Sequence, residues 1–179
     1  MKRLLRYFIV LMLMVLSGCA SMSVEECKVA RWGDVGLRDG LAGEPLAKLN
    51  DLAKDCAEAK VAVDTRAYLQ GRDQGLITYC QLDNAPRLGL AGQTYRGACP
   101  ATIDGEFHRR FDMGREVYDM RQQLRSLDNR SVDLERKLRA ATTDDARKRL
   151  REDLSDTDRR QRRARDQLRD AEWALDRIR

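Results

Sequence analysis

Two consecutive heptad repeats occupy the C-terminal part of this sequence and restrict what it can fold into. Mainly apolar residues recur in alternating steps of three and four, first over residues 117–141 and then over residues 150–178. This spacing is the a/d pattern of helices that pack along one seam. Cap-forming residues at 142–145, Thr-Thr-Asp-Asp, interrupt the pattern between the two repeats. The C-terminal part is therefore predicted to form two long helices.

The similar lengths of these helices and the short break between them favour an antiparallel hairpin. Folding the chain about residues 142–145 places Leu127 opposite Gln161 and Ser131 opposite Thr157. The polar positions of the two seams then fall in neighbouring layers, which supports the hairpin because polar groups buried against apolar ones are costly. We expect this stretch to be the weakest part of the hairpin. The alternative is one continuous helix that pairs with a second copy of the chain.

The composition changes near residue 104. Residues 106–179 carry 21 cations and 17 anions with one glycine and no proline or cysteine. Residues 19–103 contain all three prolines, all five cysteines and most of the glycines. This contrast is typical of a small stapled domain followed by long exposed helix. We predict an all-α protein with a disulfide-stapled helical domain at residues 19–103 and an antiparallel helical hairpin, a coiled coil, at residues 104–179.

Residues 1–18 have the layout of a lipoprotein signal peptide. Three cations precede an apolar run at residues 7–16, and the following Leu-Ser-Gly-Cys, which ends at Cys19, resembles the bacterial lipobox. In that motif the cysteine is linked to diacylglycerol and acylated on its new amino terminus, and several acyl chains anchor a protein firmly. The apolar run is too short to span a bilayer. Because Ala20 stands where aspartate would signal inner-membrane retention, we expect Cys19 to anchor the chain to the outer membrane, facing the periplasm.

The signal peptide also carries most of the net charge. The whole chain has a formal net charge of +5 from 34 cations and 29 anions. Without the three cations of residues 1–18, 31 cations face the same 29 anions. A secreted chain that is nearly neutral and poor in aromatic residues argues against nucleic-acid binding.

Four cysteines remain after Cys19: Cys27, Cys56, Cys80 and Cys99. An even number in an oxidising compartment predicts two disulfides, for which three connectivities are open. Pairing in sequence order, Cys27 with Cys56 and Cys80 with Cys99, closes the shortest loops and is favoured. A zinc site is the competing interpretation, but the cysteines lack the C-x₂-C spacing and the single histidine, His108, lies outside the group. We therefore expect no metal and no cofactor.

Helix signals dominate the part that contains the cysteines. Ser23 and Glu26 can form a capping box that opens a short helix. Pro45 marks the start of a second helix, and Asp64 can cap a third. Residues 82–101 hold two prolines and three glycines and are predicted to be an ordered loop.

Two segments place an aromatic residue before glycines spaced four apart, one at residues 32–40 and the other at residues 68–75. Glycine inside a helix costs about 1 kcal/mol relative to alanine, so these pairs need a compensating reason. Close helix packing is the favoured reason. The alternative is a glycine-lined cleft that presents charged side chains to a ligand, namely Asp34, Arg38, Asp39, Arg72 and Asp73.

The combined spacing of cysteines, glycines and tyrosines resembles a family of proteobacterial lipoproteins known only as a domain of unknown function. The resemblance extends over about residues 19–120 and rests on the run Trp32 to Gly43, Cys56, Tyr68-x-x-Gly71-x-x-x-Gly75-Leu76-x-x-Tyr79-Cys80, Gly89-x-x-Gly92-x-x-Tyr95-x-x-x-Cys99-Pro100 and Phe111-x-x-Gly114-Arg115. It implies a periplasmic lipoprotein with paired cysteines and supplies no activity. Two departures argue against a metal or catalytic role: Arg31 replaces an expected acidic residue, and residues 46–55 lack an expected histidine.

Five arginines crowd the second heptad repeat: Arg159, Arg160, Arg162, Arg163 and Arg165. One interpretation is a solvated helix face whose charges pair with Asp156, Asp158 and Asp166. The other is docking to an anion, either a phosphate of lipopolysaccharide or phospholipid, or a carboxylate of peptidoglycan or of a partner protein.

No catalytic constellation is visible in the sequence. His108 stands alone, with Asp104, Glu106 and Asp112 as its acidic neighbours and no nucleophile close in sequence. We expect a structural or adaptor protein of the cell envelope that acts through its charged arm and is not an enzyme. The alternative is an envelope hydrolase or ligand-binding protein that uses the glycine and tyrosine face of the N-terminal domain.

Overall fold

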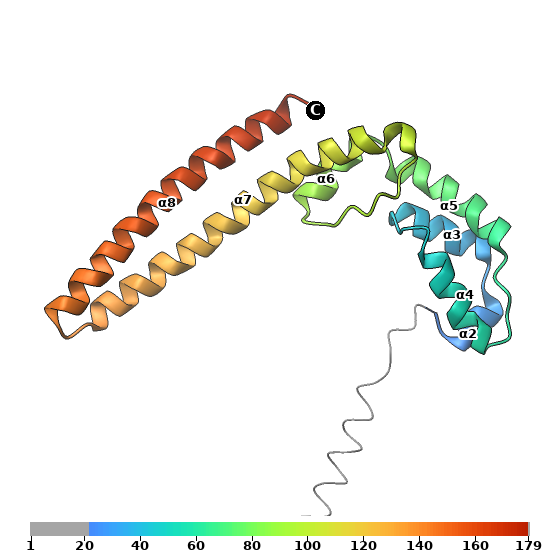
Figure 1. Cartoon of the computed structure of the whole chain (residues 1–179), viewed down its shortest axis with the longest axis horizontal. Coiled ribbons are helices and arrows are strands. Elements are labelled where there is room, and N and C mark those ends of the chain that lie inside the picture. The colour runs from blue at the N-terminus through green and yellow to red at the C-terminus, as the bar shows by residue number, and fades with distance from the viewer. Residues whose placement is uncertain (1–21, 179) are drawn as a thin grey trace, which may run out of the picture. The chain divides into compact units, whose positions relative to one another are not determined.

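The computed structural model describes residues 22–178, and every element of secondary structure in that range is a helix (Figure 1). Seven helices, α2 to α8, follow one another along these residues. Contacts divide the chain into two compact units, one that ends at Leu76 and one at Ile77–Arg179. The all-α fold class predicted from the sequence is confirmed. The division by contacts places the two disulfides in different units, whereas the change in composition lies near residue 104.

The first unit contains four helices whose starts follow from local sequence: α2 (Val24–Val29), α3 (Trp32–Leu41), α4 (Lys48–Glu58) and most of α5 (Thr65–Tyr79). The capping box before α2 is present, because Ser23 and Glu26 each bond the other's backbone N–H. At the start of α5, the Asp64 carboxylate accepts a hydrogen bond from the Ala67 N–H at 3.0 Å. Helix α4 begins at Lys48, later than predicted, because the residues directly after Pro45 form a turn.

A disulfide lies at the centre of the first unit. Cys27 of α2 is bonded to Cys56 of α4, with 5.5 Å between their Cα atoms. Trp32, Leu52 and Tyr68 pack in the same buried cluster as the two sulfurs. So short a segment can bury only a small apolar core. The disulfide therefore supplies part of the stability that a larger core would provide.

The second unit contains α6 (Asn84–Leu90), α7 (Ala101–Ala140) and α8 (Asp144–Asp176). The prediction of a loop throughout residues 82–101 is wrong, because α6 forms inside it. Pro86 lies in the first turn of this helix. Backbone N–H groups there have no acceptor within the helix, so the N–H that proline lacks removes no helical hydrogen bond. The disulfide Cys80–Cys99 closes the chain around α6. Both predicted pairings of cysteines are therefore confirmed.

Helices α7 and α8 form the predicted antiparallel hairpin and lie side by side along their lengths (Figure 1). The break follows Ala140, and the Thr143 hydroxyl caps α8 by accepting from the Ala146 N–H at 3.3 Å. The continuous helix is not what the chain forms. The predicted polar layers contain buried groups that are satisfied: Thr157 donates to the Asp153 carbonyl of its own helix at 2.9 Å.

Glycines bring α6 and α7 into backbone contact. A Cβ atom on Gly89 would lie 2.2 Å from the carbonyl oxygen of Phe111, and one on Gly114 would lie 2.2 Å from that of Pro86. Gly92, just after α6, adopts a left-handed conformation with φ of 71°, which glycine reaches without steric cost. These contacts fix α6 against residues 111–114 of α7, close to where the end of α8 packs on the same helix.

Candidate functional site

The five predicted arginines all lie on the exposed surface of α8, within the middle of the helix. Gln161 and Ala164, which alternate with them in sequence, are buried against α7. The Gln161 amide donates to the Asp128 carboxylate across the seam at 2.7 Å. The heptad pattern therefore assigns the apolar and amide side chains to the seam and leaves the arginines facing solvent.

Pairing of these arginines with aspartates is incomplete. Arg159 and Arg160 both bind the carboxylate of Asp156, at 3.2 and 3.0 Å. Within the described residues, no ion pair or side-chain hydrogen bond is formed by the other three, Arg162, Arg163 and Arg165. Asp166, predicted to pair with the cluster, instead binds Arg169 at 3.0 Å. The middle of α8 therefore carries surplus positive charge that the chain does not neutralise locally.

An exposed tryptophan near this charge was not predicted from the sequence as part of the site. Trp173 of α8 is 64% exposed, and the guanidinium carbon of Arg177 lies 4.7 Å from its ring centre. The signal was present in the sequence, because Trp173 falls between the seam residues Ala171 and Leu175 and outside the heptad pattern.

The glycine and tyrosine face of the first unit is a packed interface. A Cβ atom on Gly36 of α3 would lie 1.9 Å from the Tyr68 carbonyl oxygen, and one on Gly71 of α5 would lie 1.9 Å from that of Gly33. These distances leave no room for side chains between the two helices. The favoured interpretation, close helix packing, is confirmed by these contacts.

The five charged residues considered for a cleft do not come together. Asp34, Arg38 and Asp73 are exposed, whereas Asp39 and Arg72 are buried. Asp39 accepts a hydrogen bond from the Tyr68 hydroxyl at 2.9 Å. Burial, and then this hydrogen bond, raise the pKa of Tyr68 above its usual range.

Arg72 is held inside the first unit by the backbone. Its Nη2 donates to the Glu44 carbonyl at 2.9 Å, and its Nε has no hydrogen-bond partner among the described residues. The buried polar groups thus bond mainly to one another and to the backbone, as in a structural network.

The surroundings of His108 are also accounted for. Its side chain is 57% exposed, and its Nε2 lies 3.5 Å from a carboxylate oxygen of Asp112. The carboxylate of Asp104 accepts a hydrogen bond from the Tyr95 hydroxyl, and Glu106 binds Arg110 at 2.7 Å. Burial, followed by the bond to Asp104, raises the pKa of Tyr95 to about 12, so this hydroxyl keeps its proton at neutral pH.

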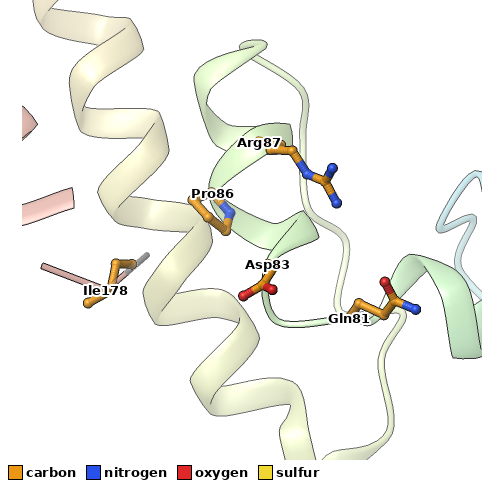
Figure 2. A pocket seen from close by; sticks show the side chains of 5 residues that line it. All are labelled: Gln81, Asp83, Pro86, Arg87 and Ile178. Atoms are coloured by element: carbon orange, nitrogen blue, oxygen red, sulfur yellow. The ribbon is translucent and has the colours of Figure 1, made fainter. Parts of the chain in front are cut away.

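An open hollow of about 400 Å³ lies beside α6 and the end of α8, lined by Gln81, Asp83, Pro86, Arg87 and Ile178 (Figure 2). In Figure 2 the Arg87 guanidinium points away from Ile178. Arg110 of α7 binds Asp83 at 3.7 Å and donates to the Ile178 carbonyl at 3.4 Å. Arg110 of α7 thus links this helix both to the start of α6 and to the end of α8. The polar groups at this hollow therefore have a structural role.

Two further findings concern the described residues as a whole. No group of three or more His, Cys, Asp or Glu residues among residues 22–178 is arranged to hold a metal ion. In the same range, no helix combines the length and the apolar character needed to cross a membrane. Cys19, the predicted lipidation site, lies outside the described residues.

The chain matches a family model over its glycine-rich part. The family described as "Protein of unknown function (DUF2799)" matches residues 31–116, from the start of α3 into α7, and the arginine cluster lies beyond this segment. No curated protein and no solved structure matches the chain. Residues 31–116 are therefore similar to the DUF2799 family of proteins of unknown function, in agreement with the resemblance predicted from the cysteine, glycine and tyrosine spacing.

Proposed function

We propose that this protein is a structural or adaptor lipoprotein of the cell envelope, anchored through Cys19 at the outer membrane and facing the periplasm. It acts through the charged hairpin of α7 and α8. The lipobox-like sequence that ends at Cys19 supports the anchor. The unpaired arginines in the middle of α8 support a binding role for the hairpin.

The observation that carries the proposal is the surplus positive charge on the exposed side of α8. The apolar seam between α7 and α8 is already packed and does not account for this charge. Leu127, Leu134, Ala164 and Ala171 of the seam are all buried, so the hairpin needs no partner to keep its shape. The guanidinium groups of Arg162, Arg163 and Arg165 face solvent without an internal carboxylate. A guanidinium group binds a carboxylate or a phosphate through two parallel hydrogen bonds. The hairpin is thus suited to an acidic protein, to peptidoglycan, to lipopolysaccharide or to anionic phospholipid.

Replacing the five clustered arginines with glutamine tests the proposal. Arg159, Arg160, Arg162, Arg163 and Arg165 are changed together, and the variant is crosslinked in cells beside the unchanged protein. We expect crosslinked partners to be lost, because glutamine keeps most of the side-chain length and removes the charge. An unchanged set of partners would contradict the proposal.

A matched control removes the same number of cations elsewhere on the hairpin. Arg136, Lys137, Arg139, Lys148 and Arg149 are exposed and lie near the tip. Their replacement with glutamine lowers the net charge equally, and we expect the crosslinked partners to be retained. Loss of partners in both variants would mean that total charge, and not the cluster, governs binding.

The structure gives no specific support to a ligand-binding role for the glycine and tyrosine face. The backbones of α3 and α5 touch at Gly36 and Gly71, and the buried Asp39 is engaged by Tyr68. A ligand would have to separate these helices to enter. We therefore propose the adaptor role alone.

A further inference from the structure

One exposed side of α8 carries a row of arginines that ends in a tryptophan. The residues are spaced three or four apart, which places them on the same side of the helix. We call this row the arginine–tryptophan stripe, and it consists of Arg159, Arg162, Arg165, Arg169 and Trp173. At 1.5 Å per residue the stripe is about 21 Å long. All five side chains are exposed.

The charges of the stripe are largely available to a partner. Arg162 and Arg165 have no ion-pair partner among the described residues. Arg169 binds the carboxylate of Asp166 at 3.0 Å, but the two side chains are 73% and 62% exposed. Exposed pairs of this kind contribute little and exchange readily with other ions. The stripe thus offers several guanidinium groups at regular intervals.

Trp173 adds an apolar group at the end of the stripe. Its exposed fraction is 64%, against 8% for Trp32 in the core of the first unit. An exposed indole ring has both an apolar body and an N–H donor, and such rings gather at the boundary between membrane and water. The adjacent Arg177, stacked on the ring at 4.7 Å, adds a further cation at this end.

The shape of the surface favours a lipid surface over a protein. Aromatic anchors of protein interfaces fill desolvated pockets, whereas Trp173 stands on a convex helix. Besides the hollow of about 400 Å³ beside α6, a second hollow of about 320 Å³ lies between α7 and the end of α8. Neither hollow is lined by a residue of the stripe. Positive charges spaced evenly along a helix fit a surface that carries many phosphate groups better than they fit a single anionic binding site.

We propose that the arginine–tryptophan stripe docks α8 lengthwise on a bilayer surface that contains anionic phospholipid. The guanidinium groups bind headgroup phosphates, and the indole ring of Trp173 enters the headgroup region. The inference rests on the proposed function, because it names the partner of the same arm. The proposed anchor at Cys19 would keep the stripe at high local concentration near a membrane.

The test reads the environment of Trp173 in the full chain. The chain has two tryptophans, and Trp32→Phe leaves Trp173 as the only one. The protein is reconstituted into vesicles of phosphatidylcholine or of equimolar phosphatidylcholine and phosphatidylglycerol. We expect emission at shorter wavelength, and quenching by brominated phospholipid, only in the vesicles with phosphatidylglycerol. High salt should reverse both changes, because it screens exposed charges.

A second measurement keeps the test valid if Trp32→Phe disturbs folding. The spectrum of the Trp173→Phe variant is subtracted from that of the unchanged protein, which gives the same Trp173 signal without altering the core. Agreement between the vesicle types in this difference spectrum would overturn the inference.

Two variants with equal charge separate the stripe from the rest of α8. Arg162, Arg165 and Arg169 are replaced with glutamine in one, and Arg149, Arg160 and Arg163, which lie off the stripe, in the other. Each stripe arginine should contribute roughly a factor of five to the docking equilibrium, so the first variant should lose the Trp173 shift and the second should keep it. Equal loss in both variants would contradict docking through the stripe.

Failure of this inference is distinguishable from failure of the proposed function. If the five-arginine variant loses its crosslinked partners while Trp173 emission is the same in both vesicle types, the arm has a partner other than phospholipid. That result would overturn the membrane inference and leave the adaptor role standing. A Trp173 shift with no change in crosslinked partners would support the membrane surface and contradict a protein adaptor.

Discussion

The helix pair α3–α5 of the first unit and the helix pair α7–α8 of the second unit pack in different ways. Helices α3 and α5 meet backbone to backbone at glycines, so that a Cβ atom on Gly36 or Gly71 would lie 1.9 Å from a carbonyl oxygen. Helices α7 and α8 meet through side chains, among them the buried Leu127, Leu134 and Ala164. The first pair requires that side chains be absent from the contact, and the second is held together by apolar side chains in the contact. A glycine contact therefore fixes one separation of the helices, whereas a side-chain seam can repack.

The buried polar groups differ in the same way. In the first unit, Asp39 and Tyr68 satisfy one another inside the core, so removal of either would leave a buried group unpaired. In the hairpin, Gln161 bonds to Asp128, which is exposed and can turn to water. Loss of a buried partner costs more than loss of a solvated one. We therefore expect the first unit to respond more strongly to substitution than the hairpin.

The largest expected effect comes from removing the disulfide of the first unit. Cys27 and Cys56, 29 positions apart, are both replaced with serine. The loop-closure entropy predicts a loss of about 3.5 kcal/mol in the free energy of unfolding. Urea unfolding followed by Trp32 fluorescence, in a Trp173→Phe background, measures this unit. Retained stability would show that the glycine contacts alone hold the unit together.

The next largest effect is expected from Gly36→Ala. The new methyl group would overlap the carbonyl of Tyr68, so α3 and α5 must move apart, at a cost of about 1–3 kcal/mol. The same Trp32 signal in urea measures the loss. Gly33→Ala is the matched control, because Gly33 lies in the same helix and its added Cβ would meet only the Ala67 carbonyl oxygen, at an ordinary contact distance of 3.7 Å. It should leave the stability of the first unit unchanged or raise it by up to about 1 kcal/mol, and a loss of similar size in both variants would contradict the packing argument.

Much of this architecture follows from the sequence because its signals are local. The capping residues Ser23 and Thr143, the heptad spacing and the order of the cysteines each concern neighbours along the chain or a simple loop-length argument. The short helix α6 was missed because Pro86 and Gly89 resemble loop residues in isolation. Their fit depends on α7, whose Gly114 allows the two backbones to touch, and no local pattern reveals that contact.

The candidate site was predictable in position but not in pairing. The heptad pattern places Arg162 and Arg165 outside the seam, and the structure agrees. Which aspartate binds which arginine depends on side-chain geometry, and Asp166 binds Arg169 in place of the cluster. Trp173 lies outside the heptad pattern, so its place off the seam was predictable, whereas its exposure depends on what packs around it. Sequence periodicity thus assigns a residue to a face but does not choose its partner.

A smaller effect, of opposite sign, is expected in the hairpin from Gln161→Leu. The side chain is 9% exposed, and leucine adds apolar area to the seam while Asp128 returns to water. We expect the free energy of unfolding to rise by about 1 kcal/mol, measured by urea unfolding monitored by circular dichroism. A polar seam residue also helps to fix the pairing state of coiled helices, so sedimentation should reveal some dimer. Destabilisation by leucine would mean that the amide bond contributes more than the apolar area.

The smallest effect concerns the exposed ion pairs of the hairpin in acid. Hydrogen bonds from Lys137 and then Arg136 hold the pKa of Asp133 below its ordinary value. The stabilisation is therefore complete at pH above the ordinary pKa and is lost as the pH falls through the lower, folded value. Asp133→Asn should remove this part of the acid dependence, measured as the urea midpoint of helix loss between neutral and acidic pH. Asp158→Asn is the control, because Asp158 forms no ion pair within the described residues, and its midpoint should follow that of the unchanged protein. Because both carboxylates are solvated, the two curves should differ far less than the disulfide and glycine variants differ from the parent.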